Sequence, residues 1–269
     1  MRWLLAILLT APAWGAEFLI QGAVDWELQP LVSALQERRE VKIAAWAFWT
    51  GRIGGHDVVI SRTDVGPINA AAVTALAIRE FHPAVVINQG TAGAHNPDLR
   101  VYDIVVGERT VDYGAFKSQP AGRGQGSDSA RWSPIPHQIR DANGEVSQYA
   151  AFPGDPAWVA RAAAQPYQHG RVVKGVIGSA YEYNREIDRI LWLRKTFGSD
   201  TEDMESAYAA GTALAMQTPF VAIRIVSDSE FSHPQLERKA GEYGAEFVAQ
   251  LVAKCCAAKG AAAAGRGAR

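Results

Sequence analysis

The chain lacks most of the features that would assign it to a metal, redox or nucleic-acid class. Its 269 residues include only two cysteines, adjacent at Cys255 and Cys256, which cannot form a disulfide framework. No histidine lies at ligand spacing beside them, so we expect the pair to pack on a C-terminal helix rather than to hold a metal. A P-loop lysine motif is also missing. The formal net charge of −1 gives no indication of a nucleic-acid or anionic-membrane partner.

Long apolar runs are scarce too, and the run at the N-terminus is too short to span a membrane. Arg2 precedes apolar residues 3–11, and residues 13–15 are Ala-Trp-Gly, with small side chains where a cleavage site needs them. We therefore predict that residues 1–15 are a signal peptide and that the mature chain begins near Ala16 or Glu17. The protein would then be exported, to the periplasm or outside the cell. A buried first strand is the other interpretation, but a better strand follows at once.

The apolar content of 48% is enough for one large core. Short apolar runs alternate with helical patterns, which predicts a single α/β domain over residues 16–256, with helices on both faces of its sheet. The expected strands are 17–22, 84–87, 103–111, 170–178 and 220–226, with a hairpin over 41–62. The expected helices are 25–39, 66–81, 155–165, 185–197, 236–256 and one within 200–216. The Ala/Gly-rich tail 257–269 is expected to be disordered.

One segment, residues 117–148, shows no sustained periodicity and is rich in Gly, Ser, Pro and Gln. A loop of this length in a compact domain is commonly functional or partly disordered. Its Trp132, Pro134 and Pro136 would either cover a pocket or pack on the surface, and the sequence leaves both interpretations open.

The stretch 87–93, Ile-Asn-Gln-Gly-Thr-Ala-Gly, is the centre of the predicted site. The apolar run 84–87 predicts a buried strand that ends abruptly at Gly90. At the carboxyl end of a parallel strand, small residues such as Ala92 and Gly93 let backbone N–H groups approach a ligand closely, and Thr91 adds a hydroxyl. An ordinary glycine-rich turn would have the same composition.

Carboxylates and other polar groups fall at the carboxyl ends of successive predicted strands. These residues are Glu27, Thr91, Tyr181, Glu205 and Asp228. Each has an ordinary structural explanation: Glu27 could complement a helix dipole, Tyr181 could simply pack, and Asp228 could cap a turn. Together they suit cleavage of a glycosidic bond. One carboxylic acid would protonate the leaving group, while another carboxylate activates water or holds the sugar.

Two buried charges add to this pattern. Glu205 follows Met204 at the start of a buried helix, where a carboxylate is costly unless it accepts hydrogen bonds, such as those of a ribose diol. Arg224 points inward from an apolar strand, where a structural ion pair is the alternative to a functional role.

Four motifs resemble, in order and spacing, the purine nucleoside phosphorylase/uridine phosphorylase superfamily, and within it the 5′-methylthioadenosine/S-adenosylhomocysteine nucleosidases. They are residues 22–27 (Gly-Ala-Val-Asp-Trp-Glu), 87–93, 203–205 (Asp-Met-Glu) and 224–228 (Arg-Ile-Val-Ser-Asp). The resemblance spans roughly residues 18–251. It implies a nucleoside phosphorylase-like fold, with a central mixed sheet twisted toward a barrel and flanked by helices. It also implies a homodimer or higher homo-oligomer, in which residues 112–116 reach toward a neighbouring chain.

The resemblance further implies the catalytic roles. Glu27 would activate the hydrolytic water, with Arg224 orienting it. Asp228, assisted by Ser227, would bond the N7/N6 edge of adenine and protonate N7, which makes the base a better leaving group.

The implied binding roles concern the sugar and the purine face. Met204 and Glu205 would hold the ribose, and Tyr181 would stack on the purine. Thr91, with Ala92 and Gly93 after it, would lie near the water or phosphate. We expect a small-molecule nucleoside as partner, no cofactor and no metal.

The choice between hydrolysis and phosphorolysis rests on charge. Phosphorolysis needs an anion site, which arginine builds best. Phosphorylases of the superfamily carry one arginine just before the Gly-Thr motif and another in the first strand–helix turn, where this chain has Asn88 and residues 25–27 (Asp-Trp-Glu). A carboxylate in that place favours water, so we predict an exported purine nucleosidase. A phosphate-dependent purine nucleoside phosphorylase and a non-catalytic nucleoside-binding or storage protein are the alternatives.

The substrate is less defined than the reaction. Ser179 stands where the bacterial nucleosidases have an aspartate, and Tyr181 replaces a phenylalanine, which leaves the 5′-substituent of the nucleoside open. Asp228 favours a 6-aminopurine without excluding a 6-oxopurine.

Overall fold

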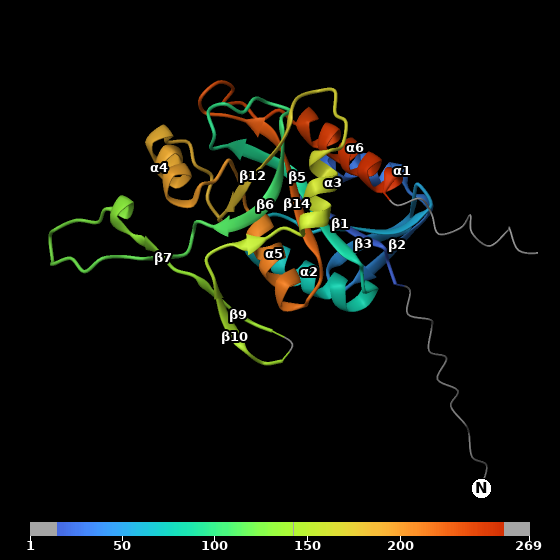
Figure 1. The fold of residues 1–269 in the computed structure, drawn as a ribbon, viewed down its shortest axis with the longest axis horizontal. Helices are drawn as coiled ribbons and strands as arrows, with labels where there is room; N and C mark the ends of the chain where they lie inside the picture. Colours follow the sequence, from blue (N-terminus) through green and yellow to red (C-terminus); the bar gives the residue numbers. More distant parts are fainter. Residues whose placement is uncertain (1–14, 142, 256–269) are drawn as a thin grey trace, which may run out of the picture.

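The computed structural model describes residues 15–141 and 143–255. The predicted signal peptide lies outside these residues except for Gly15, and the predicted disordered tail and Cys256 lie outside them entirely. In the described part, the sheet lies between two layers of helices (Figure 1).

The centre of the sheet is built from parallel strands. Strand β5 (Val85–Ala94) lies between β1 (Phe18–Gly22) and β14 (Phe220–Asp228), and β4 (His56–Arg62) pairs with the far side of β1. These strands are apolar along most of their length because helices cover both of their faces. Their carboxyl ends meet at one edge, where open α/β sheets bind ligands.

The sheet also closes on itself. Strand β14 pairs with β6 (Ile104–Asp112), β6 with β12 (Val172–Ser179), and β12 with β13 (Thr201–Asp203), which returns to β5. The pairs β14–β6 and β13–β5 are antiparallel, so the expected mixed and partly barrel-like sheet is confirmed. Strand β11 (Phe152–Pro153) adds a short antiparallel edge to β6.

Helices cover both faces of the sheet, as predicted (Figure 1). One face carries α1 (Asp25–Ala34), α3 (Pro156–Ala163) and α6 (Lys239–Lys254), whose apolar side chains share one core cluster. The other face carries α2 (Pro67–Phe81) and α5 (Ser206–Ala215), which pack in a second cluster. Helix α4 (Ile187–Phe197) follows β12 and packs on Tyr113 through Leu193.

The structure differs from the sequence prediction in four places. Residues 41–62, expected to form one hairpin, belong to three consecutive antiparallel strands. Strand β5 does not end at Gly90 but continues to Ala94, because β14 and β13 still pair with its glycine-rich half. The helix predicted to reach residue 39 ends at Ala34. The charged residues that follow form β2 (Gln36–Ile43), an exposed edge strand beside β3 (Trp46–Ile53), so they show no apolar alternation. The three-residue strand β13 was not predicted at all.

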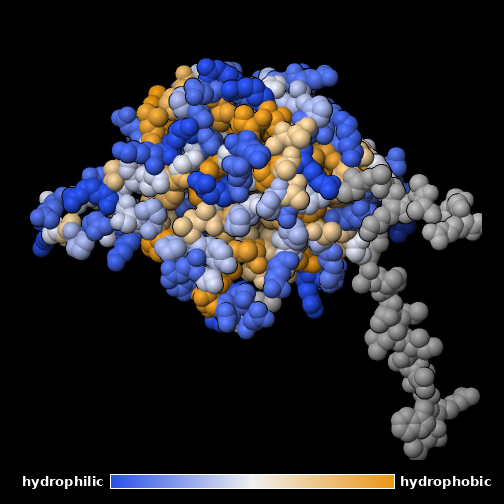
Figure 2. Space-filling view, in the orientation of Figure 1, coloured by the Kyte–Doolittle hydropathy of each residue, from blue (hydrophilic) through white to orange (hydrophobic). Residues whose placement is uncertain are grey.

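The segment 117–148 leaves the body in two parts, a long loop over residues 117–136, the arm, and a hairpin over residues 137–149 that contacts α5 (Figure 1). Its elements are β7 (Phe116–Lys117), η1 (Ser129–Arg131), β8 (Ser133–Pro134), β9 (His137–Arg140) and β10 (Val146–Tyr149). The projecting part is mostly hydrophilic on its surface (Figure 2). The contacts between this segment and the body include two hydrogen bonds, from His137 Nε2 to Asp112 Oδ2 at 2.9 Å and from Trp192 Nε1 to the Ala130 carbonyl at 3.1 Å. Ile139 and Tyr149 also pack against the core.

Within residues 15–141 and 143–255, no helix is long and apolar enough to cross a bilayer, and no group of three His, Cys, Asp or Glu side chains could hold a metal ion. Cys255 is buried at the end of α6, in the core where the sequence placed it.

Candidate active site

Glu27 lies at the first turn of α1 and points across the end of β1 to β5. Its Oε1 accepts hydrogen bonds from the backbone N–H of Thr91 at 2.7 Å and from the Thr91 hydroxyl at 2.8 Å. Its Oε2 accepts from the Ala23 N–H at 3.0 Å and the Val24 N–H at 3.3 Å. The buried side chain therefore has hydrogen bonds to both carboxylate oxygens, which offset part of the cost of burying its charge.

Gly90 leaves room for this arrangement. A Cβ at Gly90 would lie 3.0 Å from Glu27 Oε1 and 3.1 Å from its carboxyl carbon, closer than carbon normally approaches. The glycine-rich stretch thus lets a carboxylate, rather than a ligand phosphate, approach the backbone of β5.

Asp228 ends β14 and lies buried beside Gly93 of β5, its register partner. Its Oδ1 accepts from the Ser227 hydroxyl at 2.7 Å and its Oδ2 from the Tyr183 hydroxyl at 3.2 Å. Burial raises the pKa of Asp228, against the effect of these two hydrogen bonds. A larger share of the carboxyl is therefore protonated near neutral pH, as a general acid requires.

Glu205 lies at the start of α5. Its Oε1 accepts from the backbone N–H of Gly66 at 2.8 Å, and its Oε2 from the Met204 N–H at 3.3 Å. Burial raises the pKa of Glu205 to about 7, and the neighbouring Asp203 carboxylate adds to the rise. The Glu27 charge contributes to the same shift, which places the two carboxylates in one electrostatic environment.

No interaction between Arg224 and Glu27 is among those of the described residues, and the expected role of Arg224 in orienting the attacking water stays a prediction. Its Nε donates to Asp203 Oδ2 at 2.6 Å and its Nη2 to Asn88 Oδ1 at 2.6 Å, while Nη1 reaches the Asn88 carbonyl at 3.2 Å. Glu205 Oε2 is 4.0 Å from Nη2. The buried guanidinium is thus held by residues of β5 and β13.

The register of the strands places Glu27 and Asp228 beside the same part of β5. Glu27 bonds to Thr91, and Asp228 pairs with Gly93, two residues further along β5. Two residues of a strand span roughly 7 Å. Residues distant in sequence thus lie on both sides of one short strip of β5.

The remaining predicted residues lie around the same strip. The Ala92 carbonyl accepts from the Ser227 hydroxyl at 3.3 Å. Tyr181 is 71% exposed, and its ring lies against Gly66, where a Cβ would be 2.8 Å from Tyr181 Cε2. Gly66 has a φ of 101°, which favours glycine in its own right. The stacking role of Tyr181 stays a prediction.

Four residues that contact the site were not among the predicted site residues. Asp203 accepts from the Glu205 and Ser206 N–H groups at 3.0 Å each, and so caps α5. Ser179 donates to the same carboxylate at 2.5 Å, which gives the serine a structural role. Gly66 lies between Val65 and Pro67, and a Gly-Pro pair is a sequence signal for a turn that could have identified this position. Tyr183 stands in the same Tyr-Glu-Tyr stretch as Tyr181, but nothing in the sequence tells which ring faces Asp228.

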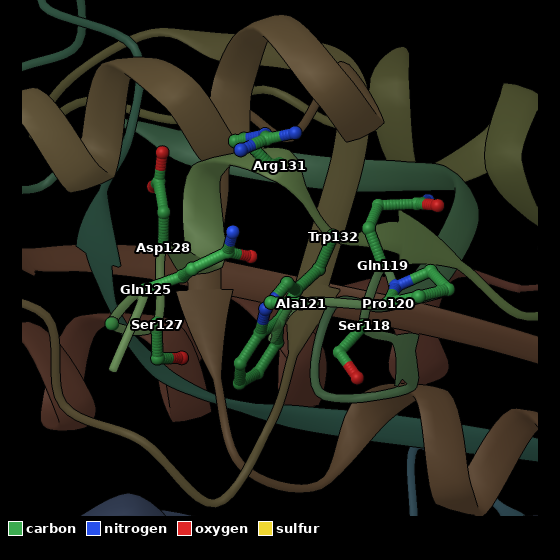
Figure 3. A pocket seen from close by; sticks show the side chains of 10 residues that line it. Ser118, Gln119, Pro120, Ala121, Gln125, Ser127, Asp128, Arg131 and Trp132 are labelled. Carbon is green, nitrogen blue, oxygen red and sulfur yellow. The ribbon is translucent and has the colours of Figure 1, made fainter. Parts of the chain in front are cut away.

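Two further predictions concern residues away from the carboxylates, and the reach of residues 112–116 toward a neighbouring chain stays a prediction. Tyr113, in the stretch expected to reach a neighbouring chain, is fully buried in its own chain, where its hydroxyl donates to Glu202 Oε2 at 2.8 Å. Trp132 does line a hollow, but one of about 630 Å³ within the arm itself, together with Arg131 and Asp128 (Figure 3). That hollow contains none of the predicted site residues.

The fold and the site can be compared with known proteins. The sequence pattern of the Phosphorylase superfamily matches residues 17–257. The chain belongs to the phosphorylase superfamily. This confirms the resemblance found in the four motifs, and the mixed, partly closed sheet is the fold expected of that superfamily.

Among curated relatives, the chain is similar to 5′-methylthioadenosine/S-adenosylhomocysteine nucleosidases. The protein of Geobacillus thermodenitrificans is 29% identical over 87% of this chain and 94% of its own length. The protein of Bacillus licheniformis is also 29% identical, over 86% of this chain and 96% of its own length. The predicted branch of the phosphorylase superfamily and the enzyme class, a nucleosidase, are confirmed by these relatives.

Two solved structures have the same fold as this chain. The nucleosidase of Neisseria meningitidis, in complex with methylthio-immucillin-A, matches with a TM-score of 0.72 and 27% identity, covering 88% of this chain and 98% of that chain. The futalosine hydrolase of Helicobacter pylori strain 26695 has a TM-score of 0.70 at 20% identity and shares the fold, over 87% of this chain and 96% of its own. The phosphorylase-superfamily fold therefore does not identify the nucleoside by itself.

Proposed function

We propose that this protein is an exported purine nucleosidase that hydrolyses the N-glycosidic bond of an adenine nucleoside of the methylthioadenosine or S-adenosylhomocysteine type. The proposal rests on the positions of Glu27 and Asp228. Glu27 bonds to Thr91 of β5, and Asp228 lies beside Gly93, two residues further along the same strand. Relatives named for these substrates support the nucleoside class.

In the proposed reaction the Asp228 carboxyl gives its proton to N7 of the purine. The C1′–N9 bond then breaks, and its electron pair leaves with the base. Glu27 takes a proton from the water that attacks C1′, so the products are free base and sugar. The raised pKa of Asp228 supports the acid role, since a neutral carboxyl is needed for it.

Glu205 is proposed to hold the ribose. Its buried carboxylate has one Arg224 nitrogen at 4.0 Å and two backbone donors, which leaves acceptor capacity for a sugar hydroxyl. Hydroxyl donors would compensate the burial that raises the pKa of Glu205 to about 7.

Water is favoured over phosphate by the contacts of Thr91 and Arg224. Both Thr91 donors are already bonded to the Glu27 carboxylate, and all three nitrogens of the Arg224 guanidinium donate to protein oxygens. A phosphate dianion at Thr91 would also lie beside the Glu27 charge, which repels it.

The test is release of free base from methylthioadenosine, adenosine and inosine, each with and without phosphate. We expect adenine from methylthioadenosine at a rate that phosphate does not change. Release that requires phosphate would support the phosphorylase alternative. Nucleoside binding without turnover would support the storage alternative.

Export is proposed from the sequence of residues 1–15, which precede the superfamily match at residue 17. The N-terminal sequence of the protein recovered from a secretion-competent host would begin at residue 16 or 17 if this is right. An intact Met1 would contradict it.

A homo-oligomer is proposed from the surface next to the site. Ile68 is 83% exposed and Val65 42% exposed, on either side of the Gly66 that holds Glu205. Sedimentation of the purified protein would give a dimer or larger species, whereas a monomer at micromolar concentration would contradict the proposal.

A further inference from the structure

Asp228 has a contact that the four motifs do not contain. Its Oδ1 is held by the adjacent Ser227, but its Oδ2 accepts a hydrogen bond from Tyr183 at 3.2 Å, from the loop after β12. The Tyr183 ring is half exposed, so the hydroxyl bond is what keeps it at the carboxylate. Burial, together with the Asp228 charge, raises the pKa of Tyr183 to about 12, so the hydroxyl remains a donor over the working pH range.

The residue after Tyr183 is fixed to the body of the protein. The Asn184 backbone N–H donates to Glu202 Oε1 at 3.0 Å, and its side-chain amide donates to Glu202 Oε2. The same carboxylate accepts from His95 Nε2 at 3.0 Å and from the Tyr113 hydroxyl at 2.8 Å.

Glu202, the residue that holds Asn184, lies close to the site. Glu202 lies on β13, is buried, and pairs with Gly93, the residue that Asp228 faces from β14. Although burial acts against it, hydrogen bonds from His95, Asn184 and Tyr113 lower the pKa of Glu202. Its carboxylate therefore stays ionised and keeps all of its donors.

We propose that Tyr183 is a positioning residue for Asp228, and that Asn184, held by Glu202, keeps Tyr183 in place. The inference rests on the proposed function, in which Asp228 is the acid. With Ser227 on one oxygen and Tyr183 on the other, the carboxyl plane is fixed before substrate arrives. Fixing a catalytic group in advance lowers the cost of reaching the transition state.

Other charged groups act on the same carboxylate. Glu202 and Glu230 act to raise the pKa of Asp228, after the larger effect of burial. Arg185, next to Asn184, donates to Glu230 at 2.8 Å. Tyr183 and Ser227 act in the opposite direction by stabilising the carboxylate. Removing the tyrosine hydroxyl leaves Glu202, Glu230 and Arg185 in place. A change in the pKa of Asp228 then measures the effect of that hydroxyl.

The first test is Tyr183→Phe, which removes one hydrogen bond and leaves the ring. The pH at which kcat/KM falls on the alkaline side should rise by about one unit, because a hydrogen bond to a charged group is typically worth about one pKa unit. We expect kcat to fall severalfold while KM changes little. Tyr149→Phe, on the exposed hairpin, is the matched control and should leave both values and the pH profile unchanged.

A carbon-13 NMR titration of the Asp228 carboxyl, assigned with Asp228→Asn, measures the same shift without turnover. An unchanged Asp228 titration in Tyr183→Phe would overturn the proposal, even if no nucleoside is hydrolysed. A shifted titration with no hydrolysis of any nucleoside would instead contradict the proposed function alone.

The second test is Asn184→Ala, which removes the side-chain link to Glu202 but keeps the Glu202 charge. The alkaline limb and the Asp228 titration should move in the same direction as in Tyr183→Phe, by a smaller amount. No movement in a folded Asn184→Ala protein would remove Asn184 and Glu202 from the proposal.

Discussion

The carboxylate site and the arm differ in how their polar groups are satisfied. Glu27, Glu205 and Asp228 are buried, and each bonds to a segment far away in the sequence. The arm residues 117–136 are exposed, and their side-chain hydrogen bonds are mostly local, such as Asp128 to the Ala130 N–H at 3.0 Å. A buried carboxylate with distant partners needs the whole fold to exist, whereas an exposed loop does not. Catalysis should therefore depend on the first region and not on the second.

The largest effect is expected for Asp228→Asn. The amide cannot donate a proton to N7, so kcat should fall by about 10²–10⁴ while the protein stays folded. Free adenine released per second, with circular dichroism as the check on folding, measures this. Unchanged activity would remove Asp228 from the mechanism.

Glu205→Gln should change how stability depends on pH. The pKa of Glu205 is about 7 in the folded protein, above its ordinary value of 4.5. The folded state therefore holds a proton that the unfolded state has lost, and the stability that this provides below 4.5 disappears as pH rises through 7. The glutamine variant lacks this loss, so it should gain on the order of 1–3 kcal/mol relative to wild type between pH 4.5 and 8. Urea unfolding of both proteins across that range is the measurement, and parallel curves would contradict the prediction.

A smaller, local effect is expected where the arm joins the body. The hydrogen bond to Asp112 raises the pKa of His137, so the charged pair is present at low pH and is lost as pH rises through that raised value. Wild type and His137→Gln should differ in trypsin cleavage at Arg123 or Arg131 at pH 6, and much less at pH 8.5. Equal cleavage of both proteins at pH 6 would show that this pair does not hold the arm.

The smallest effect is expected for Trp132→Ala. Trp132 lines the hollow in the arm and contacts Phe116, with ring centroids 6.1 Å apart, rather than any carboxylate of the site. We expect kcat/KM for methylthioadenosine to change less than twofold. A loss of tenfold or more would mean that the arm takes part in the site after all.

The order of helices and strands could be predicted because most of these elements have a recognisable pattern in their own residues. Apolar runs of strand length, the Ala-rich pattern of α2 and the glycine-rich end of β5 are each visible in one short window. The exposed β2 and the three-residue β13 were missed because they gain stability from pairing with neighbouring strands, not from their own pattern.

The sequence predicted that Glu27, Glu205 and Asp228 lie at one edge of the sheet, but it did not predict which residues they contact. Glu27, Glu205 and Asp228 follow strand ends, and strand ends converge in any sheet of this type. The choice of Asp203 and Asn88 as partners of Arg224 depends on the register of β14, β5 and β13, which no short stretch encodes. The bond from Tyr183 to Asp228 depends likewise on where Glu202 fixes Asn184.

The most direct test of the account is a double-mutant cycle of Glu27→Gln and Asp228→Asn, read as kcat for adenine release from methylthioadenosine. If both carboxylates act on one glycosidic bond, the double variant should be little slower than the slower single variant, because residues that act as a unit have non-additive effects. Two losses that multiply in full, or a Glu27→Gln protein with wild-type kcat, would contradict the claim that they share one reaction centre.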